Sequence, residues 1–394
     1  MNSSAVSTQP LGSLVDRSYK PRKSASDDAV WSLNLDQIEP HTGRVLSRCM
    51  LSASELGPST YAFDRGTVLY SKLRPYLNKV VVADEAGVAT TELVPLRCDE
   101  SRLDAKYLAH FLRGPDFLRF ATNVVAGAKM PRMVMSEFWK FPVPLPPLPE
   151  QRRIAAILDQ ADALRAKRRE ALAQLDSLTQ SIFIEMFGDP GLNPKAWPEL
   201  RLGELIVGTP NNGIFKKNEE YSAGTPVVWV EELFKGNEID CSNSRALLAS
   251  PRDKVRYGLR NGDLLFCRSS LKLAGIGYNN VYLGEDYQAL FECHVIRVSP
   301  NRNRVEPQFL NYALRLPSQR QKLFKFAKTV TMTTIDQDGL LKVSVPVPTL
   351  DLQREFSKNL LAVEVVRRCQ VATVAELDAL FASLQHRAFV GQLS

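Results

Sequence analysis

Apolar residues recur with a helical period over two long stretches of this 394-residue chain. The first stretch follows Pro149, a residue suited to the first turn of a helix, and contains no further Pro or Gly until Gly188. Alternate steps of three and four residues find apolar side chains at eight of nine positions, as in a heptad seam. The nine positions are Ile154, Ile157, Ala161, Leu164, Arg168, Ala171, Leu175, Leu178 and Ile182. This pattern predicts one long amphipathic helix.

The same pattern returns 202 residues later, where six of the nine matching positions are apolar. They are Phe356, Asn359, Val363, Val366, Gln370, Thr373, Leu377, Leu380 and Leu384. Each helix would be on the order of 55 Å long, which exceeds a domain of this size. The projecting stripe needs a partner, so we expect the two helices to pair, with the polar Arg168 and Gln370 fixing their register. The alternative is that each helix packs on its own globular block.

The remainder of the chain is also an internal repeat. The segment "VPLPPLPEQRRIAAILDQAD" from Val143 is similar to "VPVPTLDLQREFSKNLLAVE" from Val345. Three shorter pairs are "GTVLYSKLR" from Gly66 with "GDLLFCRSS" from Gly262, "YLAHFL" from Tyr107 with "FLNYAL" from Phe309, and "AKMPRM" from Ala128 with "VTMTTI" from Val330. The offset grows along the chain to 202, which indicates insertions in the loops of the second copy.

Each copy reads as a mixed block followed by its helix. Short β-branched and aromatic runs predict strands at Val68 to Ser71, Lys79 to Ala83, Leu264 to Cys267 and His294 to Val298. Helical periodicity is found at Lys106 to Leu112 and Gln308 to Leu314. We therefore predict an α+β fold with a pseudo-two-fold internal repeat. Its four parts are block one at 1–148, helix one at 149–190, block two at 191–349 and helix two at 350–394.

The charge distribution points to a polyanion as partner. The formal net charge is +7, yet residues 150–186 hold six basic and six acidic residues, and residues 351–394 hold five of each. The basic excess is therefore confined to the two mixed blocks. A protein that binds a nucleic acid with two separate domains would show this distribution, although many cytosolic proteins carry a similar net charge without binding a polyanion.

Composition indicates an ordinary cytoplasmic protein without a metal site. No apolar run approaches the ~20 residues of a membrane span, and "MNSSAVSTQPLGSLVD" lacks the features of a secretory signal. The six cysteines form no C-x-x-C pair and the four histidines are dispersed, so we expect reduced, mostly buried thiols.

Catalytic patterns are missing. The sequence has no phosphate-binding G-x-x-x-x-G-K-[ST], no G-x-S-x-G and no H-E-x-x-H. It also lacks the Gly-rich loop and Asn-Pro-Pro-aromatic box of methyltransferases, since its sole Asn-Pro is at Asn193. An acid-x-Lys pattern at Asp104 to Lys106 is too loose to indicate a nuclease. We expect a binding or scaffolding component.

The tandem blocks, each closed by "PLPPLPEQRRIAAIL" or its variant and a long helix, resemble the specificity subunit of type I restriction-modification systems over almost the whole chain. The strongest elements are Pro144 to Ile157 and "LDSLTQSIFIEMFGD" from Leu175. The second copy departs from them, with "PTLDLQ" in place of "PPLPEQ". The resemblance implies two target recognition domains, each reading half of a split sequence in double-stranded DNA. It also implies an antiparallel coiled coil of the two helices that sets their separation.

The resemblance further implies partners and the place of catalysis. Two methyltransferase subunits would dock on the helix pair, and motor-nuclease (restriction/translocase) subunits would join from outside. S-adenosylmethionine, ATP and Mg²⁺ would then belong to those subunits, and this chain alone would bind no cofactor and catalyse nothing.

In this family, DNA contacts come from the stretch after the glycine-led strand and from the loop after the second small helix. The candidates in copy one are Lys72, Arg74, Lys79, Lys129 and Arg132, and in copy two Lys216, Lys217, Arg268, Lys272, Thr331, Thr333 and Thr334. Arginine can read guanine through a bidentate pair, whereas Lys and Thr more often hold phosphates. Any single member could instead be a solvated surface residue, so the hypothesis concerns the set.

Two other interpretations stay open. A stand-alone DNA-binding regulator or architectural protein could use the same paired helices without enzymatic partners. A single-chain enzyme would require cleavage or methyl transfer by the purified protein itself.

Overall fold

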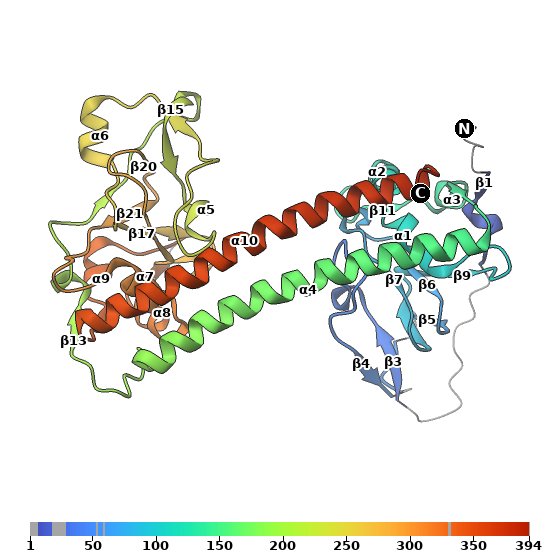
Figure 1. Cartoon of the computed structure of the whole chain (residues 1–394), viewed down its shortest axis with the longest axis horizontal. Coiled ribbons are helices and arrows are strands. Elements are labelled where there is room, and N and C mark those ends of the chain that lie inside the picture. Colours follow the sequence, from blue (N-terminus) through green and yellow to red (C-terminus); the bar gives the residue numbers. More distant parts are fainter. Residues whose placement is uncertain (1–6, 18–28, 53, 58–59, 330–331, 394) are drawn as a thin grey trace. The chain divides into compact units, whose positions relative to one another are not determined.

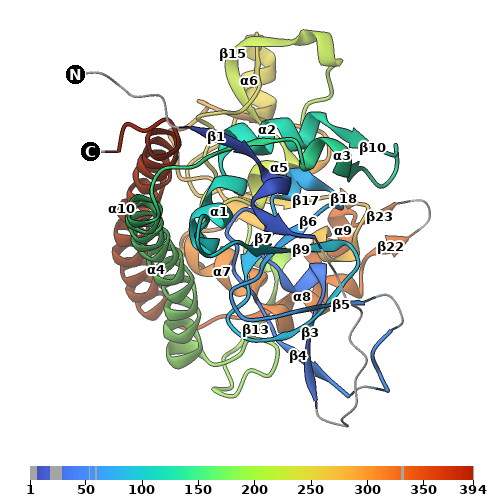
Figure 2. The ribbon, with the colours of Figure 1, turned by 90° about the vertical axis from the view of Figure 1, so that its right-hand side faces the viewer.

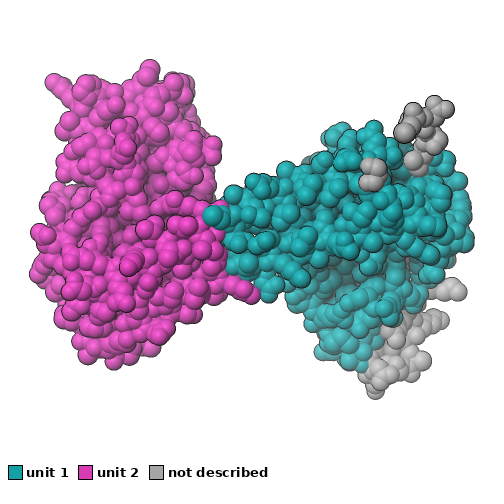
Figure 3. Space-filling model, viewed as in Figure 1, with its two compact units in different colours: residues 1–172, 369–394 teal, residues 173–368 magenta. Residues whose placement is uncertain are grey.

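The chain, seen in a computed structural model that describes residues 7–17, 29–52, 54–57, 60–329 and 332–393, forms two compact units. Unit 1 comprises residues 1–172 and 369–394, and unit 2 comprises residues 173–368 (Figure 3). Helices α4 (Leu148–Phe187) and α10 (Leu350–Phe389) are unbroken, and each belongs partly to both units (Figure 1). The two long helices predicted from the heptad pattern are therefore present, and the α+β class is confirmed.

Unit 1 contains two four-stranded sheets, with strand orders β2-β9-β6-β7 and β4-β3-β8-β5. Its strands are β1 (Thr8–Pro10), β2 (Val15–Asp16), β3 (Val30–Leu33), β4 (Cys49–Leu51), β5 (Thr60–Phe63), β6 (Val68–Ser71), β7 (Val80–Val82), β8 (Gly87–Thr90), β9 (Leu93–Cys98), β10 (Val125–Ala126), β11 (Arg132–Met133) and β12 (Pro142–Pro144). Its short helices are η1 (Leu11–Ser13), η2 (Leu35–Gln37), η3 (Pro75–Leu77), α1 (Ala105–Leu112), α2 (Pro115–Asn123) and α3 (Met135–Phe138). Strands β1 and β12 pair antiparallel, so the start of the unit is joined to the strand that leads into α4.

Unit 2 contains one four-stranded sheet of order β14-β21-β17-β19 and two three-stranded sheets of orders β16-β15-β20 and β18-β23-β22. Its strands are β13 (Glu199–Arg201), β14 (Asn211–Asn212), β15 (Tyr221–Val228), β16 (Ala246–Leu247), β17 (Leu264–Cys267), β18 (Ser269–Ser270), β19 (Asn279–Val281), β20 (Leu290–Phe291), β21 (Val295–Val298), β22 (Lys328–Thr329), β23 (Thr333–Thr334) and β24 (Ser344–Pro346). Its short helices are η4 (Leu202–Glu204), η5 (Asn218–Glu220), α5 (Val230–Leu233), α6 (Pro251–Tyr257), η6 (Leu273–Gly275), α7 (Pro307–Arg315), α8 (Pro317–Phe324) and α9 (Gln337–Leu341). Strand β13 pairs with β24 as β1 does with β12.

The local predictions agree closely with these elements. Strands β6 and β17 have the predicted bounds, and β7 and β21 lie within one residue of theirs at each end. Helices α1 and α7 each begin one residue before the predicted start. The four residues of β6 and of β17 are all buried, which explains their continuous apolar character.

The glutamine that both copies place at the start of the long helix has a structural task. Gln151 is fully buried; its side chain accepts the backbone N–H of Asp104 at 2.9 Å and donates to the carbonyl of Pro146 at 2.8 Å. Gln353 makes the matching bonds in unit 2, accepting the N–H of Glu306 at 2.8 Å and donating to a proline carbonyl at 2.8 Å. Asp104 and Glu306 are the residues before α1 and α7. Each glutamine therefore joins the proline-led turn, the long helix and a domain helix.

The long helices bury part of their surface in the domain cores. Ile154 and Leu158 of α4 and Phe381 of α10 lie in the core of unit 1, while Phe183 of α4 and Phe356 of α10 lie in that of unit 2. Within each unit, the opposite ends of α4 and α10 therefore contribute to one core.

Within each unit the two helices also exchange polar contacts. In unit 1, Asp378 accepts from Arg165 Nε at 2.6 Å and from Arg169 Nη2 at 2.9 Å. In unit 2, Arg367 lies 3.4 Å from Asp176, which is the same ion pair displaced by 202 residues in both members. Arg168 donates to Gln370 at 3.1 Å, the two polar seam positions named from sequence.

Burial along the predicted seam is uneven. Ile154 and Phe356 are buried, while Ile157, Leu175, Ile182, Val363, Gln370, Leu377 and Leu384 are half-buried and the polar Arg168 is exposed. Four apolar seam positions are exposed by about half: Leu164, Leu178, Val366 and Leu380. The full seam therefore stays a prediction. Among the described residues, neither long helix nor any other has an apolar stretch sufficient to cross a bilayer.

Candidate nucleic-acid interface

In unit 1, the loop after β6 is held against the β10–β11 hairpin by backbone bonds. The N–H of Met133 donates to the carbonyl of Lys72 at 2.8 Å, and the N–H of Arg74 donates to that of Pro131 at 2.7 Å. Arg74 adopts a left-handed backbone with φ of 49°, which reverses the chain into η3. The structure thus brings Lys72, Arg74, Lys129 and Arg132 together on one loop–hairpin surface.

Unit 2 builds the same surface in the same register. The N–H of Ile335 donates to the carbonyl of Arg268 at 3.0 Å, and β18 pairs antiparallel with β23. Both strands are labelled in Figure 2. Leu73 pairs with Arg132 in unit 1, and the repeat-equivalent residues Ser269 and Thr334 pair in unit 2. Because two dissimilar sequences preserve one register, the loop–hairpin surface is a feature of the repeat itself.

Arg132 is oriented by an acid that sequence reasoning missed. Its guanidinium donates to Glu92, with Nη2 to Oε1 at 2.8 Å and Nε to Oε2 at 3.2 Å. The hydrogen bond and the negative charge of Glu92 raise the pKa of Arg132, which stays a cation. The bidentate geometry fixes the plane of the guanidinium. Glu92 lies in the β8–β9 turn with no pattern in sequence to mark it, because its role depends on a contact 40 residues away.

Two further candidates in unit 1 differ in exposure. Lys129 is exposed between β10 and β11. Lys79 instead turns into the fold, where its ammonium donates to the carbonyl of Leu35 at 2.5 Å. Partial burial lowers the pKa of Lys79, against the opposite influence of Asp36. Among the described residues, no hydrogen bond joins the Lys79 side chain to the other candidates.

The candidates in unit 2 divide in the same way. Arg268 is half-buried and its Nη1 lies 3.4 Å from the carbonyl of Cys293, while Lys272 and Thr334 are exposed. Thr333 is buried, and its hydroxyl is 3.0 Å from that of Thr329. Thr331 lies outside the described residues.

Lys216 and Lys217 lie on the segment that leads into η5, a connection separate from the β22–β23 hairpin. Lys216 forms an ion pair of 3.6 Å with Glu220. Their membership in the DNA-contacting set stays a prediction.

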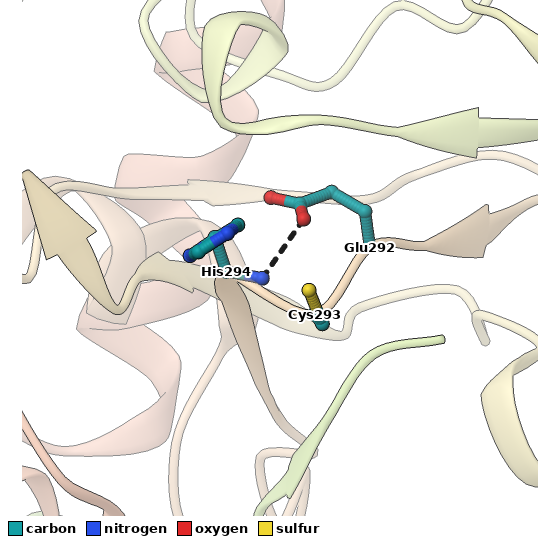
Figure 4. A group of neighbouring side chains, drawn as sticks. All are labelled: Glu292, Cys293 and His294. Carbon is teal, nitrogen blue, oxygen red and sulfur yellow. Dashed lines mark hydrogen bonds between the residues drawn. The ribbon is translucent and has the colours of Figure 1, made fainter. Parts of the chain in front are cut away.

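One group of donors could hold a metal ion. Glu292, Cys293 and His294 form the turn between β20 and β21, and their ligand atoms lie within 4.8 Å of one another (Figure 4). Glu292 Oε2 accepts the N–H of His294 at 2.9 Å, and His294 Nδ1 lies 2.7 Å from Ser269 Oγ. Burial raises the pKa of the Glu292 carboxyl. These bonds connect the turn to the loop after β17, which gives the group a structural task without a metal.

Part of unit 1 matches a known protein family. Residues 58–174 match the family model of the type I restriction modification DNA specificity domain. This segment contains the unit 1 loop, its hairpin and the first part of α4. The resemblance to specificity subunits of type I restriction-modification systems is thereby confirmed.

Individual relatives are also type I specificity subunits. The chain is 30% identical over 156 residues to the EcoDI type I specificity subunit of Escherichia coli, covering 39% of this chain and 34% of that protein. It is 23% identical over 313 residues to the EcoKI specificity subunit of E. coli strain K12, covering 75% of this chain and 67% of the relative. The chain thus spans about a third of the length of the first relative and about two thirds of the second. These relatives are specificity subunits, a non-catalytic class.

Solved structures share the fold. A chain from work on complex assembly and conformational transition of the type I R-M system matches with a TM-score of 0.57 at 21% identity, covering 99% of both chains. The type I restriction-modification S subunit from M. genitalium matches with a TM-score of 0.58 at 16% identity, covering 99% of this chain and 97% of the other.

Proposed function

We propose that this chain is the DNA-recognition subunit of a type I restriction-modification complex and reads a split target, one half with each unit. The observation that carries the proposal is the loop–hairpin surface, built twice in one register from different side chains. Copy one offers Arg132 and Lys129, whereas copy two offers Arg268, Lys272 and Thr334. Such a repeat suits two unlike half-sites, much as a symmetric dimer suits a palindrome.

The second part of the proposal is that α4 and α10 pair antiparallel as a coiled coil and act as a ruler between the half-sites. The repeat-related ion pairs Arg165–Asp378 and Arg367–Asp176 support it, because an antiparallel pair with two-fold symmetry requires such equivalence. The Arg168–Gln370 bond supports it further, since these residues are repeat mates. A polar pair in a seam is a known device for fixing register.

The third part concerns partners. Two methyltransferase subunits would dock on the helix pair, restriction/translocase subunits would join them, and the complex would act on cytoplasmic DNA. Exposed apolar side chains on α10, including Leu361 and Val365 at 55% each, support docking on these helices. S-adenosylmethionine, ATP and Mg²⁺ would be bound by the partners.

The alternative is a stand-alone DNA-binding regulator or architectural protein with the same paired helices. Affinity purification of the tagged chain from its own cells separates the two functions. We expect methyltransferase subunits in about two-to-one ratio and adenine methylation of DNA by the recovered complex. Recovery of the chain with DNA but without a methyltransferase would favour the alternative.

A further inference from the structure

The loop after β17 carries an exposed apolar surface beside the candidate DNA-contacting side chains of unit 2. It forms an open hollow of about 780 Å³ whose lining includes Phe234, Leu271, Lys272 and Met332. Leu271 is 85% exposed, which makes it one of the most solvent-accessible apolar side chains among the described residues. Single exposed apolar residues are common, but a contiguous group usually marks a surface that is covered in function.

The position of this surface within the repeat connects it to the hairpins. Met332 precedes β23, and its repeat mate Met130 precedes β11. Both methionines are exposed, at 39% and 45%. Leu271 has no such counterpart, because the segment between β17 and η6 is two residues longer than the one between β6 and η3. The hollow around Leu271 therefore gives unit 2 an exposed leucine, whereas the leucines of the same loop in unit 1, Leu73 and Leu77, are half-buried.

Charge indicates which occupant the surface fits. Lys272 is part of the lining and is exposed, so its ammonium group is accessible to a ligand. Arg268 stands at the start of the same loop. A cation beside an apolar side chain matches a DNA groove edge, where phosphates flank the bases. In the major groove the one apolar group that distinguishes a base pair is the 5-methyl of thymine.

Building on the proposed function, we propose that Leu271, with Met332 beside it, packs against a thymine 5-methyl group in the half-site that unit 2 reads. The loop would thereby specify a T·A pair through apolar contact, while Lys272 and Arg268 hold the adjacent backbone or a base edge. Unit 1 would read its own half without this contact.

Replacement of thymine by uracil tests the inference, because it removes this methyl group alone. Duplexes are first selected from a random library by the full-length chain together with any methyltransferase subunits that co-purify. Dissociation constants are then measured with uracil at each thymine of both half-sites. The half-site read by unit 2 is identified as the half whose sequence specificity is relaxed in the Arg268→Ala variant. Burial of a methyl group predicts about three- to five-fold weaker binding for uracil at one position of that half.

Leu271→Ala should bind the thymine and uracil duplexes equally well, because the side chain that contacts the methyl group is gone. Leu248→Ala is the matched control, since Leu248 is 78% exposed elsewhere in unit 2, and it should keep the wild-type preference. Uracil tolerated throughout the unit 2 half, or a preference that survives in Leu271→Ala, would overturn the inference while leaving the proposed function intact. An equal loss of affinity for the thymine and uracil duplexes in Leu271→Ala would also overturn the inference. A complex that selects no sequence would overturn the proposed function itself.

Discussion

At the scale of single residues, the candidate interface is a set of cations whose roles depend on their neighbours. Arg132 is presented as a fixed plane by Glu92, whereas Lys79 is used within the fold. The residue types were predictable from the repeat. Their neighbours were not, because Glu92 and Leu35 are distant in sequence from the side chains that they hold.

Arg132→Ala should weaken or relax recognition of one half-site and leave the other unchanged. The expected cost is about 1–3 kcal/mol of binding free energy if the guanidinium reads a base. Binding to duplexes with each half scrambled in turn measures it. Arg119→Ala is the control, since this arginine is exposed on α2 and forms an ion pair with its neighbour Asp116. Equal losses at both halves would contradict modular recognition.

His110 gives unit 1 a pH-dependent stability. The ring is buried, Arg113 donates to its Nδ1 at 3.0 Å, and its Nε2 lies 2.8 Å from Asp159. Because Nδ1 accepts a bond from a cation, the neutral ring with hydrogen on Nε2 fits this site. Burial is the main cause that lowers the pKa of His110 below its ordinary value of 6.5, and it outweighs the attraction of Asp159.

A lowered pKa means that the unfolded chain takes up this proton first, so stability should fall as the pH drops below 6.5. Thermal melts from about pH 7.5 to about pH 5.5 measure the effect. His110→Gln can keep both hydrogen bonds without titrating, and its melting temperature should depend less on pH over this range. His386→Gln, at an exposed position on α10, should behave like the wild type. The same pH dependence in His110→Gln would show that another group is responsible.

At the scale of elements, much of the fold could be predicted from the sequence. The long helices follow from heptad spacing and the absence of Pro and Gly, and β6 and β17 follow from short apolar runs between turn residues. The sheet β4-β3-β8-β5 could not be foreseen. It requires β3 to pair parallel with β8, a partner more than fifty residues away that no local period indicates.

Gln151→Ala should destabilise unit 1, because it leaves the N–H of Asp104 and the carbonyls of Pro146 and Arg102 without their side-chain partner. Unsatisfied buried groups cost about 1–3 kcal/mol each, so the melting temperature should fall by several degrees. Differential scanning calorimetry provides the measurement. Gln160→Ala, on an exposed face of α4, serves as the comparison and should change little. Similar stability of both variants would remove the proposed task of the repeated glutamine.

The ruler hypothesis predicts the result of lengthening both helices together. One heptad inserted after Ala171 in α4 and another after Thr373 in α10 would lengthen the pair by about 10 Å. The tolerated spacer between half-sites should then grow by about three base pairs. Selection of targets from a library with variable spacers reads this out. A heptad in one helix alone should lower stability by breaking the register. An unchanged spacer in a folded double insertion would exclude the ruler.

At the scale of the whole molecule, the internal repeat provides one candidate DNA-reading surface for each half of the proposed split target. The similarity of residues 58–174 to a DNA specificity domain lies almost entirely in the first unit, and because the second unit repeats the loop–hairpin pairing we propose the same function for it. The recognised bases could not be predicted from the sequence, because they depend on loop geometry and on small insertions such as the one that carries Leu271.

Genome-wide mapping of methylated adenine in cells with and without this gene tests the central claim most directly. If the chain reads a split target, one motif should disappear with the gene: two unlike specific halves, separated by a fixed nonspecific spacer, with a methylated adenine in each half on opposite strands. An unchanged methylation pattern, or loss of a continuous motif without a spacer, would contradict it.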